Sequence, residues 1–537
     1  MRYMKRFMRI MRPDRLLALL LCLMLLPGAA MGETIDGDAA MLAGADGYVP
    51  GINMDADLVV GYVAAAGAAV NPFVCNNRDL LSLNQLVFES VVELDENMQP
   101  VPLLADSWTK SGRTWTFQLR SGVTFHNGAE LTASDVVASY KRILAAGSAC
   151  PYYARLSLIK NMQATDLLTF QVESTYDGYL ALYALTFPVV QYSTMEDDMP
   201  RGTGPYWYTQ YIPDTGVRLE RNPLWWKKDP QIESVAAVRY AESGDALEAL
   251  HTNEINLLCS QSSSASLSRK LSKFTSMDYH TNTYELLIPN LHSSSLMSDV
   301  RMRQAVMYAI DRAQIAENAY LGLGVQCEVP VHPASWLYES QSAIYYYSPE
   351  RALQLVQECG WRDLTGDGML NQLDGVILKD LTVRIITYND ATTSVRENAA
   401  NMIATYLENV GIHARVEVLA PGKVSDRIDA RNYDLALVGM NLSEVPNLVP
   451  MFYTDNNLNL NRYSNDEMNL LLQQSVSVTD PEQMKNVYSQ IQMTVVDRLP
   501  IMGLLFRTGT VLSTRSLAGL SGIRAFDMLN GIEFMQK

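Results

Sequence analysis

Residues 104–144 carry the clearest alternation of hydrophobic and polar positions in the chain. Within them, residues 114–119 place every second side chain on one apolar face, which is typical of a half-buried strand. The His-Asn-Gly triplet at residues 126–128 predicts a turn, because Asn and Gly tolerate positive φ. Thr132 and Asp135 then predict the start of an amphipathic helix, with Thr132 as its N-cap. The apolar residues expected on the buried faces of this strand and helix are Trp115, Phe117, Leu119, Val136, Val137 and Tyr140.

The second half of the chain alternates strand-like and helix-like patterns. Residues 381–388 and 412–419 have the pattern of strands, and the apolar spacing of residues 396–410 predicts a helix that ends at Gly411. A strand–helix–strand unit implies a right-handed parallel crossover. Residues 433–439 predict a further strand, after which the composition changes to Asn, Ser, Pro and aromatic residues. This order of elements indicates an α/β fold.

Length and charge limit the class of protein. A chain of 537 residues is too long for one hydrophobic core and predicts two or three domains. Its formal net charge is −16, and residues 1–32 hold six basic residues and one acidic residue, or +5, so the remainder carries −21. An acidic body of this size is repelled by phosphate backbones and by anionic lipid. We therefore expect no nucleic-acid partner.

The N-terminus has the pattern of an export signal. Basic residues come first, an apolar run spans residues 16–26, and small residues precede a cut before Glu33. This pattern predicts a signal peptide over residues 1–32, followed by a flexible leader over residues 33–55 that is rich in Gly and Ala. Cys22 fits badly as a lipid-attachment site, since it lies inside the apolar run after a leucine. We expect cleavage to an exported protein rather than retention at the membrane.

Five cysteines remain after the predicted cleavage site. An odd number cannot pair completely within one chain, and no two of them have the spacing of a metal site. One or two disulfides are compatible with export to an oxidising compartment. The sequence leaves their pairing open. The five residues are Cys75, Cys150, Cys259, Cys327 and Cys359.

Three segments together resemble one known family. Residues 104–144 follow the order "adSW…ytF.LR.GvkFhdG.plta.DV..s.kR", residues 299–312 follow "DvRvRqAl.yaiDr", and residues 202–206 read GTGPY. These patterns are similar to those of the extracellular solute-binding proteins of family 5. That family comprises the dipeptide- and oligopeptide-type receptors of ABC importers. The resemblance covers about residues 58–537.

The resemblance implies a two-lobed, periplasmic-binding-protein-like α/β fold of type II, with hinge crossings between the lobes. We expect the first lobe over residues 56–283, with an extra subdomain at about 85–200. The second lobe then spans residues 284–498, and residues 499–537 return to the first lobe. The implied function is capture of a small solute, a peptide, for an ABC permease in the membrane. We expect a monomer without a cofactor.

The resemblance also indicates where the ligand would bind. Peptide-binding members hold the α-amino group of the ligand with an aspartate shortly after the strand that here spans residues 433–439. No aspartate follows in this chain, and Met440 stands where the family often has Trp. Glu444 could accept the ammonium group instead, or Ser443 and Asn441 could line a polar pocket for a neutral ligand. A third interpretation turns Glu444 to solvent.

Glu89 is a candidate from the first lobe. It lies in an FES triplet at the position of the family's FEG, within a predicted helix over residues 84–92, and we expect it on the surface of that helix. No residue is predicted to be catalytic or to bind a metal. The candidate ligand-binding residues are Met440, Asn441, Ser443, Glu444, Asn447 and Glu89.

Other functions are open to different degrees. An exported hydrolase needs a nucleophile with a base or a metal cluster, but the six histidines are scattered and neither HExxH nor GxSxG occurs. Residues 363–374 match an EF-hand calcium loop except that Asp374 replaces the glutamate at position 12, so we interpret them as a helix-to-strand connection. A receptor for a sugar or a metal chelate, or one that reports to a sensor, is an alternative that the sequence does not separate from peptide import.

Overall fold

The computed structural model describes residues 51–390 and 393–536 of the 537-residue chain. The predicted signal peptide and most of the predicted leader lie outside these residues. The elements of the first lobe are β1 (Leu58–Val63), α3 (Arg78–Asn84), β8 (Tyr206–Ile212), β9 (Gly216–Arg221), β10 (Ser234–Tyr240), α5 (Ser243–His251), β11 (Leu257–Ser260) and α6 (Ser263–Ser268). A separate group of elements comprises β2 (Val92–Leu94), β3 (Pro100–Pro102), β4 (Ala105–Ser111), β5 (Thr114–Leu119), α4 (Ala133–Ala146), β6 (Ile159–Ala164) and β7 (Thr169–Ser174).

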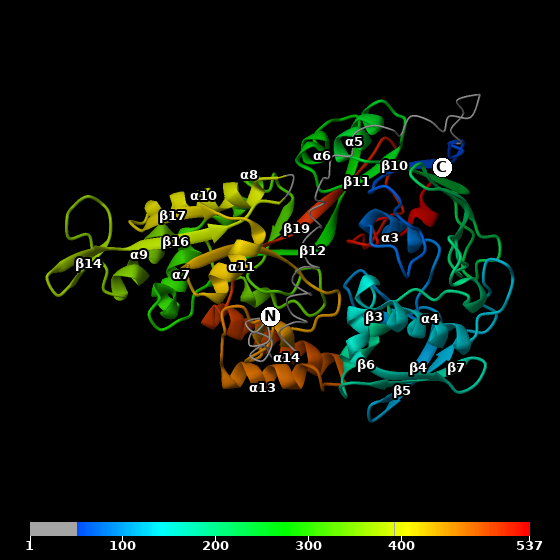
Figure 1. Ribbon diagram of the computed structural model, residues 1–537, viewed down its shortest axis with the longest axis horizontal. Coiled ribbons are helices and arrows are strands. Elements are labelled where there is room, and N and C mark those ends of the chain that lie inside the picture. Colours follow the sequence, from blue (N-terminus) through cyan, green and yellow to red (C-terminus); the bar gives the residue numbers. More distant parts are fainter. Residues whose placement is uncertain (1–50, 391–392, 537) are drawn as a thin grey trace, which may run out of the picture.

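The second lobe holds most of the helices (Figure 1). Its first elements are α7 (Val300–Ala309), α8 (Arg312–Asn318), β13 (Gly324–Gln326), α9 (Pro349–Glu358), β14 (Asn371–Asp374) and β15 (Ile377–Asp380). Those that follow are β16 (Thr382–Thr387), α10 (Val395–Glu408), β17 (His413–Val418), α11 (Pro421–Asp429), β18 (Leu435–Asn441), α12 (Val449–Phe452), α13 (Asp466–Ser475) and α14 (Pro481–Arg498).

An 11-stranded sheet runs through both lobes. Its order is β17-β16-β18-β12-β19-β11-β1-β10-β9-β8, with β13 paired to β19. The strands that join the lobes are β12 (Thr275–Pro289) and β19 (Met502–Ser513), which pair with each other antiparallel along most of their length. Their register shifts between His280 and Tyr284, close to the predicted junction at residues 283 and 284. A register shift bends and twists a strand locally. The paired strands β12 and β19 are therefore bent where they pass from one lobe to the other.

Within this separate group, four strands form a second sheet with the order β4-β5-β7-β6, packed under α4, and β2 and β3 pair with each other (Figure 1). The predicted alternation is confirmed on β5, where Trp115, Phe117 and Leu119 are buried. The predicted helix start is also confirmed, because Thr132 is the N-cap of α4 and forms a capping box with Asp135. Burial of one strand face and one helix face is what the amphipathic patterns require.

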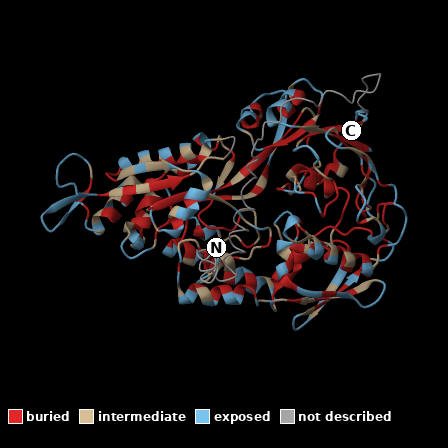
Figure 2. Ribbon diagram, viewed as in Figure 1, coloured by how far each residue is buried: buried red, intermediate tan, exposed pale blue. Residues whose placement is uncertain are grey.

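The second lobe contains the predicted crossover. β16 and β17 pair parallel, and α10 joins them and packs against both. The inner strands β16 and β18 of this lobe are largely buried, whereas many residues of its helices are exposed (Figure 2). The fold is therefore the two-lobed α/β fold that the sequence predicted.

The chain beyond β19 lies against the first lobe. Met528 N donates to Ser82 Oγ in α3, and Arg524 Nη2 donates to the carbonyl of Leu94 at 3.0 Å. Leu520, Leu529 and several other apolar residues of this C-terminal segment are buried. The segment thus forms part of the wall of the first lobe.

The five cysteines of the described residues are all free, with Cys75, Cys150, Cys259 and Cys327 buried and Cys359 partly exposed. Burial raises the pKa of the Cys75 thiol to about 11, which keeps it protonated at neutral pH. Within residues 51–390 and 393–536, none of the helices combines the length and the apolar character needed to cross a membrane.

Candidate solute-binding site

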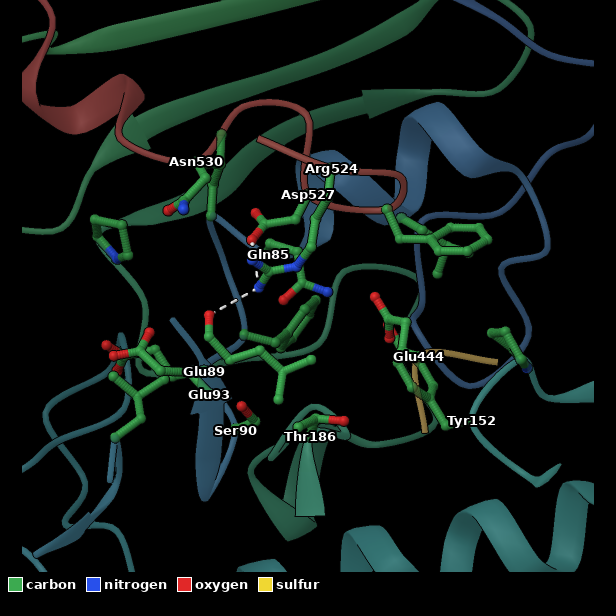
Figure 3. Close-up of a pocket in the computed structure, with 18 of the residues that line it drawn as sticks. Gln85, Glu89, Ser90, Glu93, Tyr152, Thr186, Glu444, Arg524, Asp527 and Asn530 are labelled. Carbon is green, nitrogen blue, oxygen red and sulfur yellow. Dashed lines mark hydrogen bonds and ion pairs between the residues drawn. The ribbon is translucent and has the colours of Figure 1, made fainter. Parts of the chain in front are cut away.

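A pocket of about 170 Å³ lies between the first lobe and a loop of the second lobe. Its first-lobe wall is formed by the chain that follows α3 and by the segment around residues 151–155. The C-terminal segment at residues 524–533 closes another side, and Glu444 enters from the loop after β18. Figure 3 shows Glu89 and Glu93 on one side of the view and Glu444 with Tyr152 on the other, below Arg524 and Asp527. A ligand here would contact both lobes.

Glu89 forms the base of the first-lobe wall. Its side chain is buried, and its carboxylate accepts hydrogen bonds from Trp225 Nε1 at 3.2 Å, Trp226 Nε1 at 2.8 Å and Thr203 Oγ1 at 2.8 Å. Burial raises the pKa of Glu89, and the charge of Lys227 opposes that rise. Both indoles and the hydroxyl therefore fix the carboxylate in place.

The prediction for the surroundings of Glu89 was wrong. The helix α3 spans Arg78–Asn84 and is capped by Asn77, so Glu89 lies beyond its end rather than on a helix surface. The reason is local packing at the GTGPY motif. A Cβ at Gly202 would lie 2.0 Å from the Val87 carbonyl oxygen, and one at Gly204 would lie 2.6 Å from that of Leu86. The two glycines let this motif pack directly on the irregular chain before Glu89.

Glu444 is bound to Arg155 across the pocket. Arg155 Nη2 donates to Glu444 Oε2 at 2.9 Å, and the two side chains are 14% and 18% exposed. Arg155 is also held in its own lobe. Its Nη1 donates to the Thr186 carbonyl at 3.1 Å and to Thr186 Oγ1 at 2.5 Å, and its guanidinium lies over the ring of Tyr152. The interpretation that turned Glu444 to solvent is therefore wrong.

The C-terminal wall carries a second ion pair. Arg524 Nη2 lies 3.3 Å from Asp527 Oδ2. Burial raises the pKa of Asp527 from 3.8 to about 6, an effect that Arg524 opposes and that the charges of Glu444 and Glu93 reinforce. Asp527 therefore lies in the same electrostatic field as Glu444.

Carboxylates outnumber cations in the pocket. Burial raises the pKa values of Glu93 and Glu533, and neither side chain has an ion-pair partner within the part of the chain that the structure describes. Lys227 lies near both, with its Nζ 5.0 Å from the centre of the Trp226 ring. Five carboxyl groups face three cations, a balance of −2 when every group is ionised, and protonation of the carboxyl groups with raised pKa values makes the pocket less negative. The charged residues are Glu89, Glu93, Glu444, Asp527, Glu533, Arg155, Lys227 and Arg524.

Four of the predicted ligand-binding residues do not line this pocket. Asn441 Oδ1 accepts from Thr283 Oγ1 at 2.8 Å, and Met440 packs against the core on β18. Ser443 Oγ and Asn447 Oδ1 each accept from a backbone N–H two residues later, so both stabilise local turns. Their contact with a solute stays a prediction, whereas Glu89 and Glu444 are brought to one cavity.

The sequence did not indicate the cations of the pocket. Arg155 and Glu444 are separated by 289 positions, and Arg524 reaches the first lobe only through the return of the chain along β19. The only signal for such contacts in the sequence is opposite charge. Because the chain holds 42 basic and 58 acidic residues, that signal does not identify which residues pair.

Residues 363–374 form a turn and the first strand of a hairpin. The carboxylate of Asp363 accepts from the backbone N–H groups of Gly366 at 2.6 Å and Gly368 at 2.9 Å. Asp374 lies in β14, where it pairs with Lys379 across the hairpin. Within the described residues, groups of three or more His, Cys, Asp or Glu residues that could hold a metal ion are absent. The segment connects α9 to a strand, as we interpreted it.

The structure has two lobes with a pocket where they meet, which is the arrangement of receptors that hold a solute between two halves. The family described as bacterial extracellular solute-binding proteins, family 5 Middle, matches residues 99–459, about two thirds of the chain. The chain belongs to this family, which confirms the resemblance seen in the sequence.

Named relatives cover most of the chain. The oligopeptide-binding protein AppA of Bacillus subtilis is 23% identical, and the match covers 86% of this chain and 88% of that protein. The dipeptide-binding protein of Escherichia coli is 27% identical over 58% of this chain and 67% of that protein.

Solved structures share the fold. AppA of Bacillus subtilis in complex with a nonapeptide has a TM-score of 0.59 at 21% identity, over 89% of this chain and 97% of that chain. A nickel ABC transporter structure from Bacillus halodurans has a TM-score of 0.75 at 19% identity, over 89% of this chain and 98% of that chain.

Proposed function

We propose that this protein is an exported receptor of an ABC importer and that it captures peptides in the pocket between its lobes. Membership of the solute-binding family supports the receptor role, and the relatives named for oligopeptides and dipeptides support the solute class. The observation that carries the proposal is the pocket itself, to which the first lobe gives Arg155 and the second gives Glu444. No covalent bond is made or broken in this function.

The pocket suggests how a peptide would be held. The ammonium group of the peptide would lie against Glu444, where Asp527 adds a second negative charge. The ammonium group must either share Glu444 with Arg155 or displace the Arg155 guanidinium from it. A displaced guanidinium would be free to bind a carboxylate of the same peptide. Because such a ligand contacts both lobes only when they are together, its binding stabilises the closed form that a permease would recognise.

A thermal-shift and calorimetry screen tests the proposal. The mature protein is mixed with di- to pentapeptides, with sugars and with nickel–histidine chelates. A peptide present at 100 times its dissociation constant should add about 2.7 kcal/mol to the free energy of unfolding and raise Tm. Stabilisation by sugars or chelates alone would contradict the peptide assignment and leave the receptor role. Hydrolysis of generic ester or peptide substrates above the rate of denatured protein would contradict the receptor role.

A further inference from the structure

A hairpin projects from the second lobe at the far end of the long axis of the molecule (Figure 1). It consists of β14 and β15, which pair antiparallel with Leu373 opposite Leu378 and Asp374 opposite Ile377. Gly375, with φ of +64°, takes the first position of its two-residue turn, a place that glycine fills without strain. The tight turn holds the next residue, Val376, at the tip.

The hairpin exposes apolar side chains that nothing in the described part of the chain covers. Val376 is 97% exposed, Ile377 62%, Leu373 60% and Leu378 42%, and Figure 2 shows the projection as exposed beyond its buried base at Asn371. Leu373 and Leu378 share one face, Ile377 lies on the other and Val376 is between them at the tip. Contiguous exposed apolar residues mark interaction sites, and apolar groups on both faces fit a groove better than a flat surface.

Charge decides what kind of surface would receive the hairpin. Residues 363–380 contain four aspartates and one lysine, a net charge of −3, and Lys379 is already paired with Asp374. Anionic lipid would repel this segment, as it would the acidic body of the protein. A second copy of the same hairpin also carries a net charge of −3, so the two copies would repel each other. A protein groove bordered by basic side chains has the complementary charge. The acidic residues are Asp363, Asp367, Asp374 and Asp380.

We propose that the β14–β15 hairpin is a docking element that inserts into an apolar groove, bordered by Lys or Arg, on the extracytoplasmic face of the membrane permease. This inference rests on the proposed importer function. The hairpin is remote from the solute pocket, so docking through it and binding of solute are separable.

The test compares two double variants of the mature protein. Val376→Ser with Ile377→Ser removes the apolar tip. Leu167→Ser with Leu267→Ser is the matched control, since these leucines are 63% and 60% exposed and lie in the β6–β7 turn and on α6. Stimulation of ATP hydrolysis is measured with nanodiscs that carry an ABC permease and ATPase from the same organism, chosen as the pair that takes up peptides with this protein. The tip variant should need at least ten times more protein for half-maximal stimulation, with peptide affinity and Tm unchanged.

Four results would overturn the docking proposal. They are stimulation by the tip variant equal to that by the wild type, a control variant as weak as the tip variant, tip-dependent binding to empty nanodiscs of anionic lipid, and a wild-type dimer in sedimentation that the tip variant abolishes. Higher ionic strength should weaken stimulation by the wild type, because the charge complementarity is exposed to salt. A wild-type protein that binds none of the peptides would contradict the proposed function instead.

Discussion

Single side chains decide what the pocket can hold. Glu444 accepts a hydrogen bond from Arg155 at 2.9 Å and is largely shielded from water. Solvent therefore screens the attraction between its charge and nearby cations only weakly. Burial is the main reason that the pKa of Asp527 is raised, and the negative charges of Glu444 and Glu93 add to the rise. A cation that enters the pocket relieves this repulsion.

Glu444→Gln keeps the shape of the side chain and removes its charge. We expect the affinity for a peptide with a free N-terminus to fall by more than about 1.4 kcal/mol, a factor of ten in Kd, because a charge-assisted hydrogen bond is lost. Isothermal calorimetry measures this change. Glu417→Gln is the control, since that residue forms an ion pair with Arg427 away from the pocket. Equal Kd values for wild type and Glu444→Gln would remove Glu444 from this role.

Asp527 makes stability depend on pH. Its folded pKa of about 6 is above the ordinary value of 3.8, so the folded protein binds more protons between these limits. The stability that protonation contributes is fully present below about pH 4 and is lost as pH rises through 6. Between pH 4 and pH 7 the wild type should lose up to about 3 kcal/mol more stability than Asp527→Asn. Urea denaturation across this range measures the difference, and parallel pH profiles would contradict it.

At the scale of elements, close backbone approach positions the site. The GTGPY segment contacts the backbone of Leu86 and Val87 because Gly202 and Gly204 lack side chains. This contact sets the path of the chain from α3 to Glu89, and the Trp225 and Trp226 indoles then bind the carboxylate. The GTGPY motif therefore packs against the chain before Glu89, and through this packing it sets the position of Glu89 in the pocket wall.

Gly202→Ala should destabilise the protein by about 2–4 kcal/mol, because the new methyl group would overlap the Val87 carbonyl and the chain must move. The same shift displaces Glu89, so peptide affinity should fall as well. Chemical denaturation and calorimetry give the two values. Gly244→Ala is a matched control in α5, where a Cβ would meet no atom within 4 Å and stability should stay equal or rise. Unchanged stability of Gly202→Ala would refute the packing argument.

At the scale of the whole molecule, direct contacts join the lobes in addition to the crossing strands. Trp336 of the second lobe donates through its backbone N–H to Asn97 at 2.8 Å and through Nε1 to Tyr183 OH at 2.9 Å. Tyr179 N donates to the carbonyl of Val478 at 2.8 Å. These contacts and the Arg155–Glu444 pair all depend on the relative position of the lobes.

Arg155→Met removes the ion pair between the lobes and retains a long side chain. Loss of a partly buried, charge-assisted contact of about 2 kcal/mol shifts the equilibrium between closed and open forms about thirtyfold toward open. The radius of gyration of the solute-free protein in small-angle X-ray scattering should therefore increase. Arg427→Met breaks an ion pair within one lobe and should leave it unchanged. A radius of gyration that changes neither on Arg155→Met nor on addition of any solute would contradict hinged closure.

The sequence by itself determined the elements and the class. Alternation on residues 114–119, the Thr132 cap and the β16–α10–β17 crossover are local patterns, and local patterns follow from backbone geometry and burial of one face. The family resemblance then supplied the two-lobed architecture. Of the six candidate site residues, the sequence placed Glu89 and Glu444 in regions that do meet at the pocket.

Only the tertiary structure decided which groups face one another. Arg155 meets Glu444 over 289 positions, and Arg524 and Asp527 reach the pocket because the chain returns along β19. Glu89 is buried under two indoles because glycines elsewhere permit close packing. Such contacts depend on how whole elements pack in space, which side-chain periodicity along one strand or helix does not record.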